Sequence, residues 1–204
     1  MNEELANAWK NKNIFRKQLE YNKNEFFSYP PHWISSVKLM EHFDIKSVLD
    51  VGCGCGSFYK VCQDSLPDVS YTGIDYSEDA IELAKETWDP SAFFAKDVLD
   101  LTEEDVEPYD LIFMGALLDV RPDGDQVLDH VLSLKADNIL ISRMKLTESE
   151  SFFHTYKAYD EITTCAYHHN KDNFVDVCKE NSYNMFSIED NYFLKSEKND
   201  AGSS

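Results

Sequence analysis

The chain has 204 residues, of which 43% are hydrophobic, which suits one folded domain with a substantial core and argues against a disordered chain. Its 38 acidic and 19 basic residues give a formal net charge of −19, which repels phosphate backbones and anionic lipid head groups. We therefore expect a small-molecule partner, with no nucleic acid and no membrane among the ligands. The composition leaves the oligomeric state open.

The ends and the cysteines of the sequence favour a cytoplasmic protein. No apolar run is long enough to span a bilayer, and Met1-Asn2-Glu3-Glu4 lacks the basic and then apolar form of a signal peptide. The five cysteines are an odd number without scaffold spacing, as expected for reduced thiols. Cys53 and Cys55 have no second Cys/His pair at zinc-site spacing, so we expect no bound metal.

Residues 1–44 are predicted to form a helical and aromatic cover. Leu5, Trp9, Phe15 and Leu19 lie among Lys, Asn and Glu, which approximates one amphipathic helix over residues 2–20. The aromatic turn 26–33 contains two prolines that delay the next helix, which is expected from about Trp33 to residue 42.

Residues 45–196 are predicted to form one α/β domain. Apolar runs predict strands at 47–51, 69–75, 92–97, 109–115 and 138–143, and helical spacing follows the first, second and fourth of them. This alternation is typical of a doubly wound, mostly parallel sheet with ligands at the carboxyl ends of its strands. A helix at 171–181 and strands near 185–188 and 192–195 would complete seven strands with an antiparallel edge strand. Segment 147–169 shows no clear pattern, and 197–204 is expected to be a flexible tail.

A glycine-rich turn follows the first predicted strand. Val48, Leu49 and Val51 have the near-continuous apolar character of a buried parallel strand. Three alternate glycines then allow unusual dihedral angles and a close approach of the backbone to a ligand: Gly52, Gly54 and Gly56. A dinucleotide fingerprint would place its third glycine at position 57, where this chain has Ser57.

Three segments resemble motifs of the class I S-adenosylmethionine-dependent methyltransferases. Residues 48–56 resemble motif I, residues 73–77 are similar to the second motif, and residues 110–115 resemble motif IV. The resemblance covers about residues 45–145. It implies a Rossmann-like fold, methyltransferase activity and S-adenosyl-L-methionine as the cofactor.

The same resemblance implies roles for residues at the strand ends. Asp75 would accept hydrogen bonds from both ribose hydroxyls, Tyr76 would lie against the adenine, and Asp97, with the Val98 backbone nearby, would accept from the exocyclic amine. The complete set implied to contact the cofactor is Asp50, Gly52, Cys53, Gly54, Gly56, Asp75, Tyr76, Asp97, Val98, Met114 and Gly115.

The methyl acceptor is less well defined by the sequence. A hydroxyl acceptor needs a base, for which the catalytic candidates are His168, His169 and Asp119. Arg143 could hold a carboxylate or phosphate, or could pair with a neighbouring acid, and tyrosines could form a wall for a cationic or planar acceptor. The substrate-binding candidates are Tyr29, His32, Arg143, Tyr156, Tyr159 and Tyr167.

The leading hypothesis is an S-adenosylmethionine-dependent methyltransferase that carries out N- or O-methylation of a small molecule without a metal. A looser similarity to small bacterial methyltransferases of uncharacterised type, some of which accompany surface-polysaccharide genes, adds a sugar or surface-polysaccharide precursor as a candidate acceptor. An NAD-dependent oxidoreductase and a non-catalytic S-adenosylmethionine-binding module are the alternatives.

Overall fold

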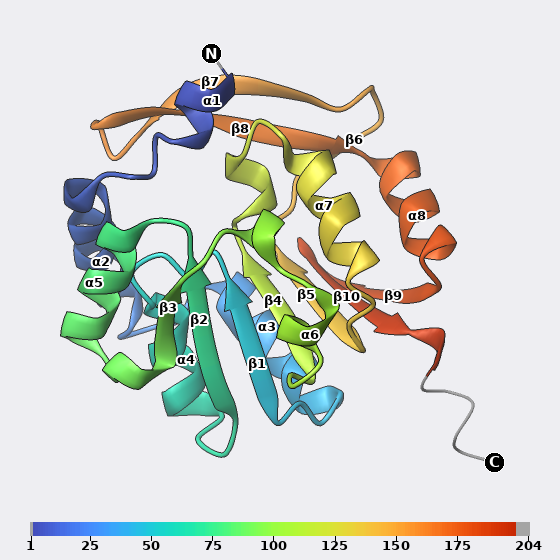
Figure 1. Ribbon diagram of the computed structural model, residues 1–204, viewed down its shortest axis with the longest axis horizontal. Coiled ribbons are helices and arrows are strands. Elements are labelled where there is room, and N and C mark those ends of the chain that lie inside the picture. The colour runs from blue at the N-terminus through green and yellow to red at the C-terminus, as the bar shows by residue number, and fades with distance from the viewer. Residues whose placement is uncertain (1, 199–204) are drawn as a thin grey trace.

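A seven-stranded sheet forms the centre of the molecule. The computed structural model describes residues 2–198, with a three-stranded sheet lying above one edge of the larger one (Figure 1). The parallel strands are β1 (Ser47–Val51), β2 (Ser70–Asp75), β3 (Phe93–Ala95), β4 (Leu111–Gly115) and β5 (Asn138–Ser142). The hairpin of β9 (Tyr183–Ile188) and β10 (Asn191–Ser196) completes the order β3-β2-β1-β4-β5-β10-β9.

The predicted fold class is confirmed. β10 is antiparallel to β5, and the edge strand β9 is antiparallel to β10. The expected Rossmann-like α/β architecture with seven mostly parallel strands is therefore present. Short strands and turns account for small differences at the ends of the predicted ranges, such as β3, which has three residues.

Helices cover both faces of the sheet. One face carries α3 (Pro31–His42), α4 (Ser57–Ser65) and α5 (Glu78–Thr87), and the other carries α6 (Glu103–Val106), α7 (Gly124–Ser133) and α8 (Lys171–Glu180). Three 3₁₀ turns, η1 (Pro90–Ala92), η2 (Val98–Asp100) and η3 (Leu118–Val120), follow α5, β3 and β4. Side chains alternate along β1, so Val48 joins one core while Leu49 and Val51 join the other. No helix within residues 2–198 has the length and apolar character to cross a membrane.

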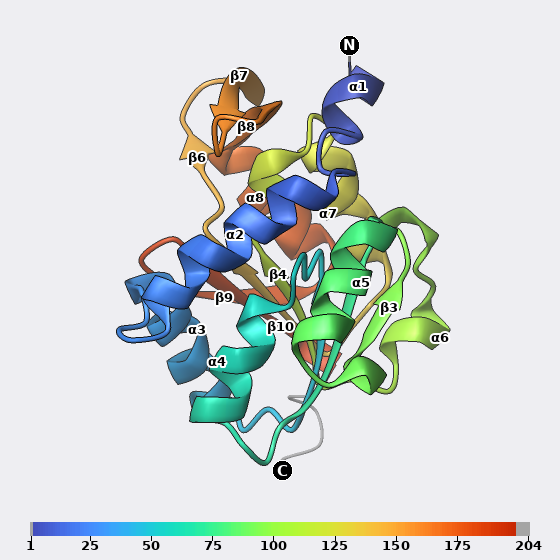
Figure 2. The same cartoon turned by 90° about the vertical axis from the view of Figure 1, so that its left-hand side faces the viewer.

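The N-terminal segment differs from the single helix that the sequence predicts. It forms α1 (Asn2–Ala6) and α2 (Lys12–Glu25), separated at Asn11, whose side chain caps α2 by accepting from the Asn13 amide at 3.0 Å. A local hydrogen bond of this kind favours starting a new helix over continuing the first. Figure 2 shows α2 crossing in front of the sheet between α3 and α1.

The sequence shows no clear pattern in segment 147–169, but in the structure this segment belongs to the smaller sheet. β6 (Leu146–Thr147), β7 (Phe152–Ala158) and β8 (Ile162–Asn170) pair in the order β6-β8-β7, with β7 and β8 as an antiparallel hairpin. Most of β7 is exposed, so its sequence lacks the alternation of apolar and polar residues that reveals a half-buried strand. Of the predicted tail, residues 199–204 lie outside the described part of the chain.

Residues 2–25 and the β7–β8 hairpin together cover the carboxyl edge of the sheet, and we call them the roof. Phe15 and Leu19 of α2 pack with Leu83 of α5 and with Ile162 of the hairpin. Trp9 Nε1 donates to Thr164 Oγ1 at 3.0 Å, and Lys17 pairs with Glu161 at 2.5 Å. The two parts of the roof are thereby joined directly above the ends of β1, β2 and β4 (Figure 1).

Candidate active site

The glycine turn after β1 holds a shape that other residues would adopt only with strain. Gly52 and Gly54 have φ values of 78° and 54°, and the Gly52 amide donates to the Ile74 carbonyl at 2.8 Å. Gly56 has φ 74°, and a Cβ added to it would lie 2.7 Å from Cζ of Phe93. Gly52 and Gly54 line the space above the turn, whereas Gly56 is packed beneath it.

Two adjoining pockets lie between this turn and the roof. The hairpin pocket, about 290 Å³, is bounded by Trp9, Phe15, Asp75, Tyr76 and residues 156–159. The helix pocket, about 240 Å³, is bounded by Asn22, Glu25, His32, Asp50 and Ser57. The two pockets share a set of lining residues, namely Gln18, Gly52, Gly54, Gly115, Ala116, Arg143 and Tyr159. They are therefore two lobes of one cleft, with a volume typical of small-molecule sites.

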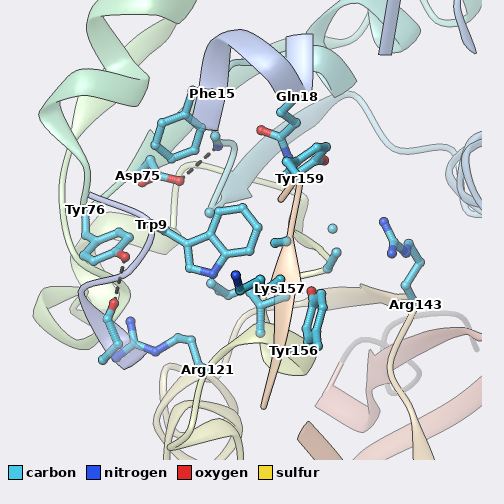
Figure 3. A pocket seen from close by; sticks show the side chains of 18 residues that line it. Trp9, Phe15, Gln18, Asp75, Tyr76, Arg121, Arg143, Tyr156, Lys157 and Tyr159 are labelled. Carbon is cyan, nitrogen blue, oxygen red and sulfur yellow. Dashed lines mark hydrogen bonds between the residues drawn. The ribbon is translucent and has the colours of Figure 1, made fainter. Parts of the chain in front are cut away.

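Asp75 ends β2 and lies at the wall of the hairpin pocket. Its Oδ2 accepts from the Gly54 amide at 3.0 Å, and its Oδ1 accepts from the Ser77 amide at 2.9 Å (Figure 3). Burial raises the pKa of Asp75 to about 6, although the two amides oppose the shift. Each carboxylate oxygen has a second lone pair, so the oriented group can accept further hydrogen bonds from a ligand.

Asp50 lies on the other side of the turn, in the helix pocket. It is buried, and the hydroxyl of Tyr71 donates to its Oδ2. Burial raises the pKa of Asp50 to about 7, while the Tyr71 hydrogen bond works in the opposite direction. Near neutral pH, Asp50 thus takes both protonation states.

Aromatic residues form much of the hairpin pocket. Tyr76 donates from its hydroxyl to the Ala6 carbonyl at 2.7 Å, and Trp9 lies between Tyr76 and Tyr156 in Figure 3. Arg121 lies on the same side as Tyr76, but Asp123 neutralises it through two hydrogen bonds of 2.9 and 2.8 Å. This part of the cleft can therefore receive a flat, uncharged group such as a nucleobase.

Four of the expected cofactor contacts do not line either pocket. Asp97 caps η2 by accepting from the Leu99 amide at 3.0 Å, and its Oδ1 lies 3.7 Å from Nη1 of Arg121. Val98 and Met114 are buried in the core, and Gly56 packs against Phe93. The remaining expected contacts do line the cleft, namely Asp50, Gly52, Cys53, Gly54, Asp75, Tyr76 and Gly115.

The expected catalytic residues do not line the cleft. His168 stacks on Phe152 with ring centroids 4.7 Å apart, on the opposite side of β8 from its neighbours in sequence. His169 is buried with its Nδ1 2.6 Å from Asp125 Oδ1. Asp119 is buried in η3 beneath β8, and burial raises its pKa. None of the three lines either pocket, although Leu117, Val120 and Arg121, which are close to Asp119 in sequence, line the hairpin pocket.

The expected substrate-binding residues divide into two groups. Tyr29 donates to Asp64 at 2.5 Å outside the cleft, and Tyr167 is buried against the start of α7. These two residues therefore do not line either pocket. The members of the second group line the cleft, namely His32, Arg143, Tyr156 and Tyr159. Burial and the Arg143 charge lower the pKa of His32 to about 4, so its imidazole is neutral at pH 7.

Several lining residues were not singled out by the sequence. Gln18, Asn22 and Glu25 come from α2, and Lys157 comes from β7. The helical spacing of Phe15 and Leu19 shows that α2 has an apolar face, but it carries no information on what its polar face meets. The sequence offers one signal for Lys157, which is that basic residues are scarce in this chain, with 19 against 38 acidic residues.

The fold and the cleft together define a protein of the doubly wound α/β class, with a candidate ligand site at the carboxyl edge of the sheet. Residues 49–141 match a family profile described as "Methyltransferase domain". Over these residues the chain is therefore similar to a methyltransferase domain.

Two curated relatives with a similar sequence are also methyltransferases. The chain is 36% identical over 110 residues to a malonyl-[acyl-carrier protein] O-methyltransferase of Acetivibrio thermocellus, covering 50% of this chain and 38% of the relative. It is 32% identical over 91 residues to a trans-aconitate 2-methyltransferase of Escherichia coli O1:K1 / APEC, covering 45% and 35%. The chain thus spans less than half the length of these relatives.

Solved structures share the fold at low sequence identity. Human N-acetylserotonin methyltransferase in complex with SAM has a TM-score of 0.66 at 14% identity, covering 96% of this chain and 60% of that one. A sugar N-methyltransferase from Streptoalloteichus sp ATCC 53650 has a TM-score of 0.63 at 9% identity, covering 88% and 92%. At these identities the likeness concerns the fold.

Proposed function

We propose that this protein transfers a methyl group from S-adenosyl-L-methionine to a small molecule. The observation that carries the proposal is the Asp75 carboxylate, which two backbone amides orient at the wall of a pocket directly above the glycine turn. A carboxylate in this position suits the two neighbouring hydroxyls of a ribose. We infer that residues 45–196 form the methyltransferase domain and residues 1–44 its cover.

The residues present fit the cofactor. Gly54 has no Cβ, and a Cβ added there would lie 3.1 Å from Oε1 of Gln18. Without a side chain at this position, the backbone itself can approach a ligand. Tyr76 and Trp9 provide apolar surface for an adenine, and the turn from Gly52 to Gly54 with Gly115 would flank the methionine part. When bound, S-adenosylmethionine supplies an electrophilic methyl group on a positively charged sulfur.

The chain itself contributes alignment and exclusion of water. The roof closes the cleft from above, because Trp9 and Lys17 tie the N-terminal segment to the β7–β8 hairpin. A displacement at a methyl group is accelerated mainly when donor and acceptor are held in line in a dry site. An acceptor that arrives as a neutral amine or as an anion needs no further base, which agrees with a cleft that His168, His169 and Asp119 do not line.

The acceptor class follows from several indications. Both relatives described above are named for acceptors that carry carboxyl groups, which favours O-methylation in this chain as well. The net charge of −19 argues for a free small molecule over nucleic acid or membrane, and a cytoplasmic location suits reduced cysteines. A sugar precursor is the second candidate acceptor.

Calorimetry with three ligands tests the proposal. We expect S-adenosylmethionine and S-adenosylhomocysteine to bind at one site and NAD not to bind, since buried Ser57 stands where a dinucleotide loop has its third glycine. NAD binding without either sulfur ligand would support an oxidoreductase. Binding of the sulfur ligands by a protein that transfers no methyl group to any of a panel of carboxylic acids, amines and sugars would support the non-catalytic module.

A further inference from the structure

Arg143 occupies a central place in the cleft. It follows β5 directly, and its side chain lines both the hairpin pocket and the helix pocket (Figure 3). Its backbone amide donates to the Asp190 carbonyl at 2.9 Å, and its φ of 66° is in the left-handed region. The turn after β5 is thus fixed in a conformation that is costly for arginine, and it carries the guanidinium to the junction of the two pockets.

The Arg143 guanidinium forms no hydrogen bond or salt bridge in the described part of the chain, although its charge opposes the effect of burial on the pKa of Asp119. No side-chain hydrogen bond and no salt bridge within 4.0 Å joins it to another group among residues 2–198, although the chain has 38 acidic residues. Arg121, in the same cleft, is held by two hydrogen bonds to Asp123. Arg121 therefore belongs to an internal ion pair, whereas the exposed Arg143 lines the cleft and keeps its donors available to a ligand.

The surroundings of Arg143 suit an organic anion. Lys157 also lines the hairpin pocket without an ion pair among the described residues, so a second positive charge is within the same lobe. Tyr156 and Tyr159 provide apolar ring surface beside these cations, and the neutral His32 adds no competing charge. An anion with a short carbon skeleton would find both kinds of contact.

The position of Arg143 separates it from the groups expected to hold the cofactor. In the order β2-β1-β4-β5, Arg143 is three strands from Asp75, which is roughly 14 Å at ordinary strand spacing. Gly115, at the end of β4, lies between them. A ligand anchored at Asp75 and extended over the glycine turn would therefore have Arg143 beyond its far end.

We propose that Arg143 is the residue that recognises an anionic methyl acceptor, a small organic molecule with a carboxylate or phosphate group. This inference rests on the methyltransferase function proposed above. Arg143 binds the anion through paired N–H donors, and Lys157 adds attraction from the side of the hairpin. The acceptor's anion is thus drawn into the cleft of a protein whose surface is strongly acidic.

Anion binding to the full chain saturated with S-adenosylhomocysteine tests this assignment. Malonate and inorganic phosphate are titrated at constant ionic strength, with malonamide as the uncharged probe, and binding is followed by the side-chain Nε–H signals of arginine. We expect saturable binding of at least one anion, perturbation of the Arg143 signal and none by malonamide. Arg143→Gln should weaken anion binding tenfold or more, and Arg143→Lys less than that.

Lys145→Gln is the matched control, because Lys145 is exposed, lies two residues away and lines neither pocket. It removes the same charge and should change anion affinity less than twofold. Equal losses in the Arg143→Gln and Lys145→Gln proteins would overturn the proposal, as would the absence of saturable anion binding to the wild type.

A second arm distinguishes the acceptor's anion from the carboxylate of the cofactor. If Arg143 holds the cofactor, Arg143→Gln will weaken S-adenosylhomocysteine but not 5′-methylthioadenosine, which lacks the amino acid part, and the proposal fails. We expect the affinities of both to stay within twofold of the wild type, which also shows that the variant is folded. If the wild type binds neither nucleoside, the methyltransferase function itself is refuted. The anion titration alone cannot give this result, so failure of the function and failure of the Arg143 assignment are distinguishable.

Discussion

Asp75 performs two tasks that a substitution can separate. Its Oδ2 holds the glycine turn through the Gly54 amide, its Oδ1 accepts from the Ser77 amide at the start of α5, and Asp75 lines the hairpin pocket. An asparagine can still accept from one amide but loses the charge and one acceptor oxygen. The residue therefore connects the geometry of the loop to the recognition of a ligand.

We predict that Asp75→Asn weakens S-adenosylhomocysteine binding by about 1.5–3 kcal/mol, as for a lost hydrogen bond to a charged group. Titration calorimetry provides the measurement. Asp79→Asn, on α5 outside both pockets, is the control and should bind as the wild type does. Equal affinity in the Asp75→Asn protein would remove Asp75 from the site.

His32 gives a prediction on stability in acid. Its pKa of about 4 in the folded protein is below the ordinary value of 6.5, so the folded state binds fewer protons than the unfolded state between these values. His32 therefore costs stability as the pH falls from 6.5 to 4. His32→Gln should recover on the order of 1 kcal/mol at pH 4 relative to pH 7, after allowance for solvent screening.

Urea unfolding at pH 4 and pH 7 measures this difference. His42→Gln is the comparison, because His42 is exposed at the end of α3. If both variants have the same pH dependence, the effect does not come from the position of His32 beside Arg143.

At the scale of elements, the central sheet and the helical character of residues 2–20 could be predicted, whereas the β7–β8 hairpin could not. The strands of the sheet are buried on both faces, so their sequences are apolar runs such as Val48-Leu49 and Ile139-Leu140-Ile141. β7 is exposed over most of its length, and its pairing with β8 leaves no periodic signal. Sequence patterns reflect burial, and β7 has too few buried residues to produce such a pattern.

The same reasoning explains which site residues were found. Gly52, Asp75 and Gly115 follow recognisable strands, so their meeting at one edge follows from the topology. His168 and His169 were chosen by residue type, but their positions depend on the alternation of β8, which was not predicted. Lys157 meets Arg143 in one pocket only because the hairpin folds back over the sheet.

The roof provides a prediction on ligand exchange. Trp9→Phe keeps a smaller aromatic ring but removes the hydrogen bond to Thr164, which is worth roughly 0.5–1.5 kcal/mol. We expect S-adenosylhomocysteine to dissociate about two- to tenfold faster, because the two parts of the roof separate more readily. Stopped-flow displacement by excess unlabelled ligand measures this rate.

Tyr183→Phe is the control for the Trp9 variant. It removes a buried hydrogen bond of 2.8 Å to the Ala136 carbonyl, far from the cleft. This variant should lose a similar amount of stability and keep the wild-type dissociation rate. Faster dissociation in both would indicate general loosening of the fold.

At the scale of the whole molecule, buried carboxyl groups determine the response to pH. The pKa values of Asp50, about 7, and Asp75, about 6, lie above the unfolded value of 3.8. The folded state therefore holds more protons between pH 4 and 7, and these two groups lower the free energy of unfolding as the pH rises through that range. The net charge of −19 acts in the same direction.

We predict that Asp50→Asn reduces this decline by on the order of a few kcal/mol between pH 4 and 7. Denaturant unfolding across that range, at fixed ionic strength, gives the profile. Asp68→Asn removes an exposed acid and should leave the slope as it is in the wild type. A wild-type profile that rises between pH 5 and 7 would contradict the shifts assigned to both buried acids.

The hydrogen bond between Trp9 and Thr164 joins positions 155 residues apart. Closing so long a stretch of chain is slow compared with forming local contacts, so the roof is expected to assemble after the sheet beneath it. During synthesis, residues 45–145 can place Gly52 and Asp75 before the β7–β8 hairpin has been translated. An early intermediate would then present an open nucleoside cleft, and retention of the methyl donor would mark the last stage of maturation.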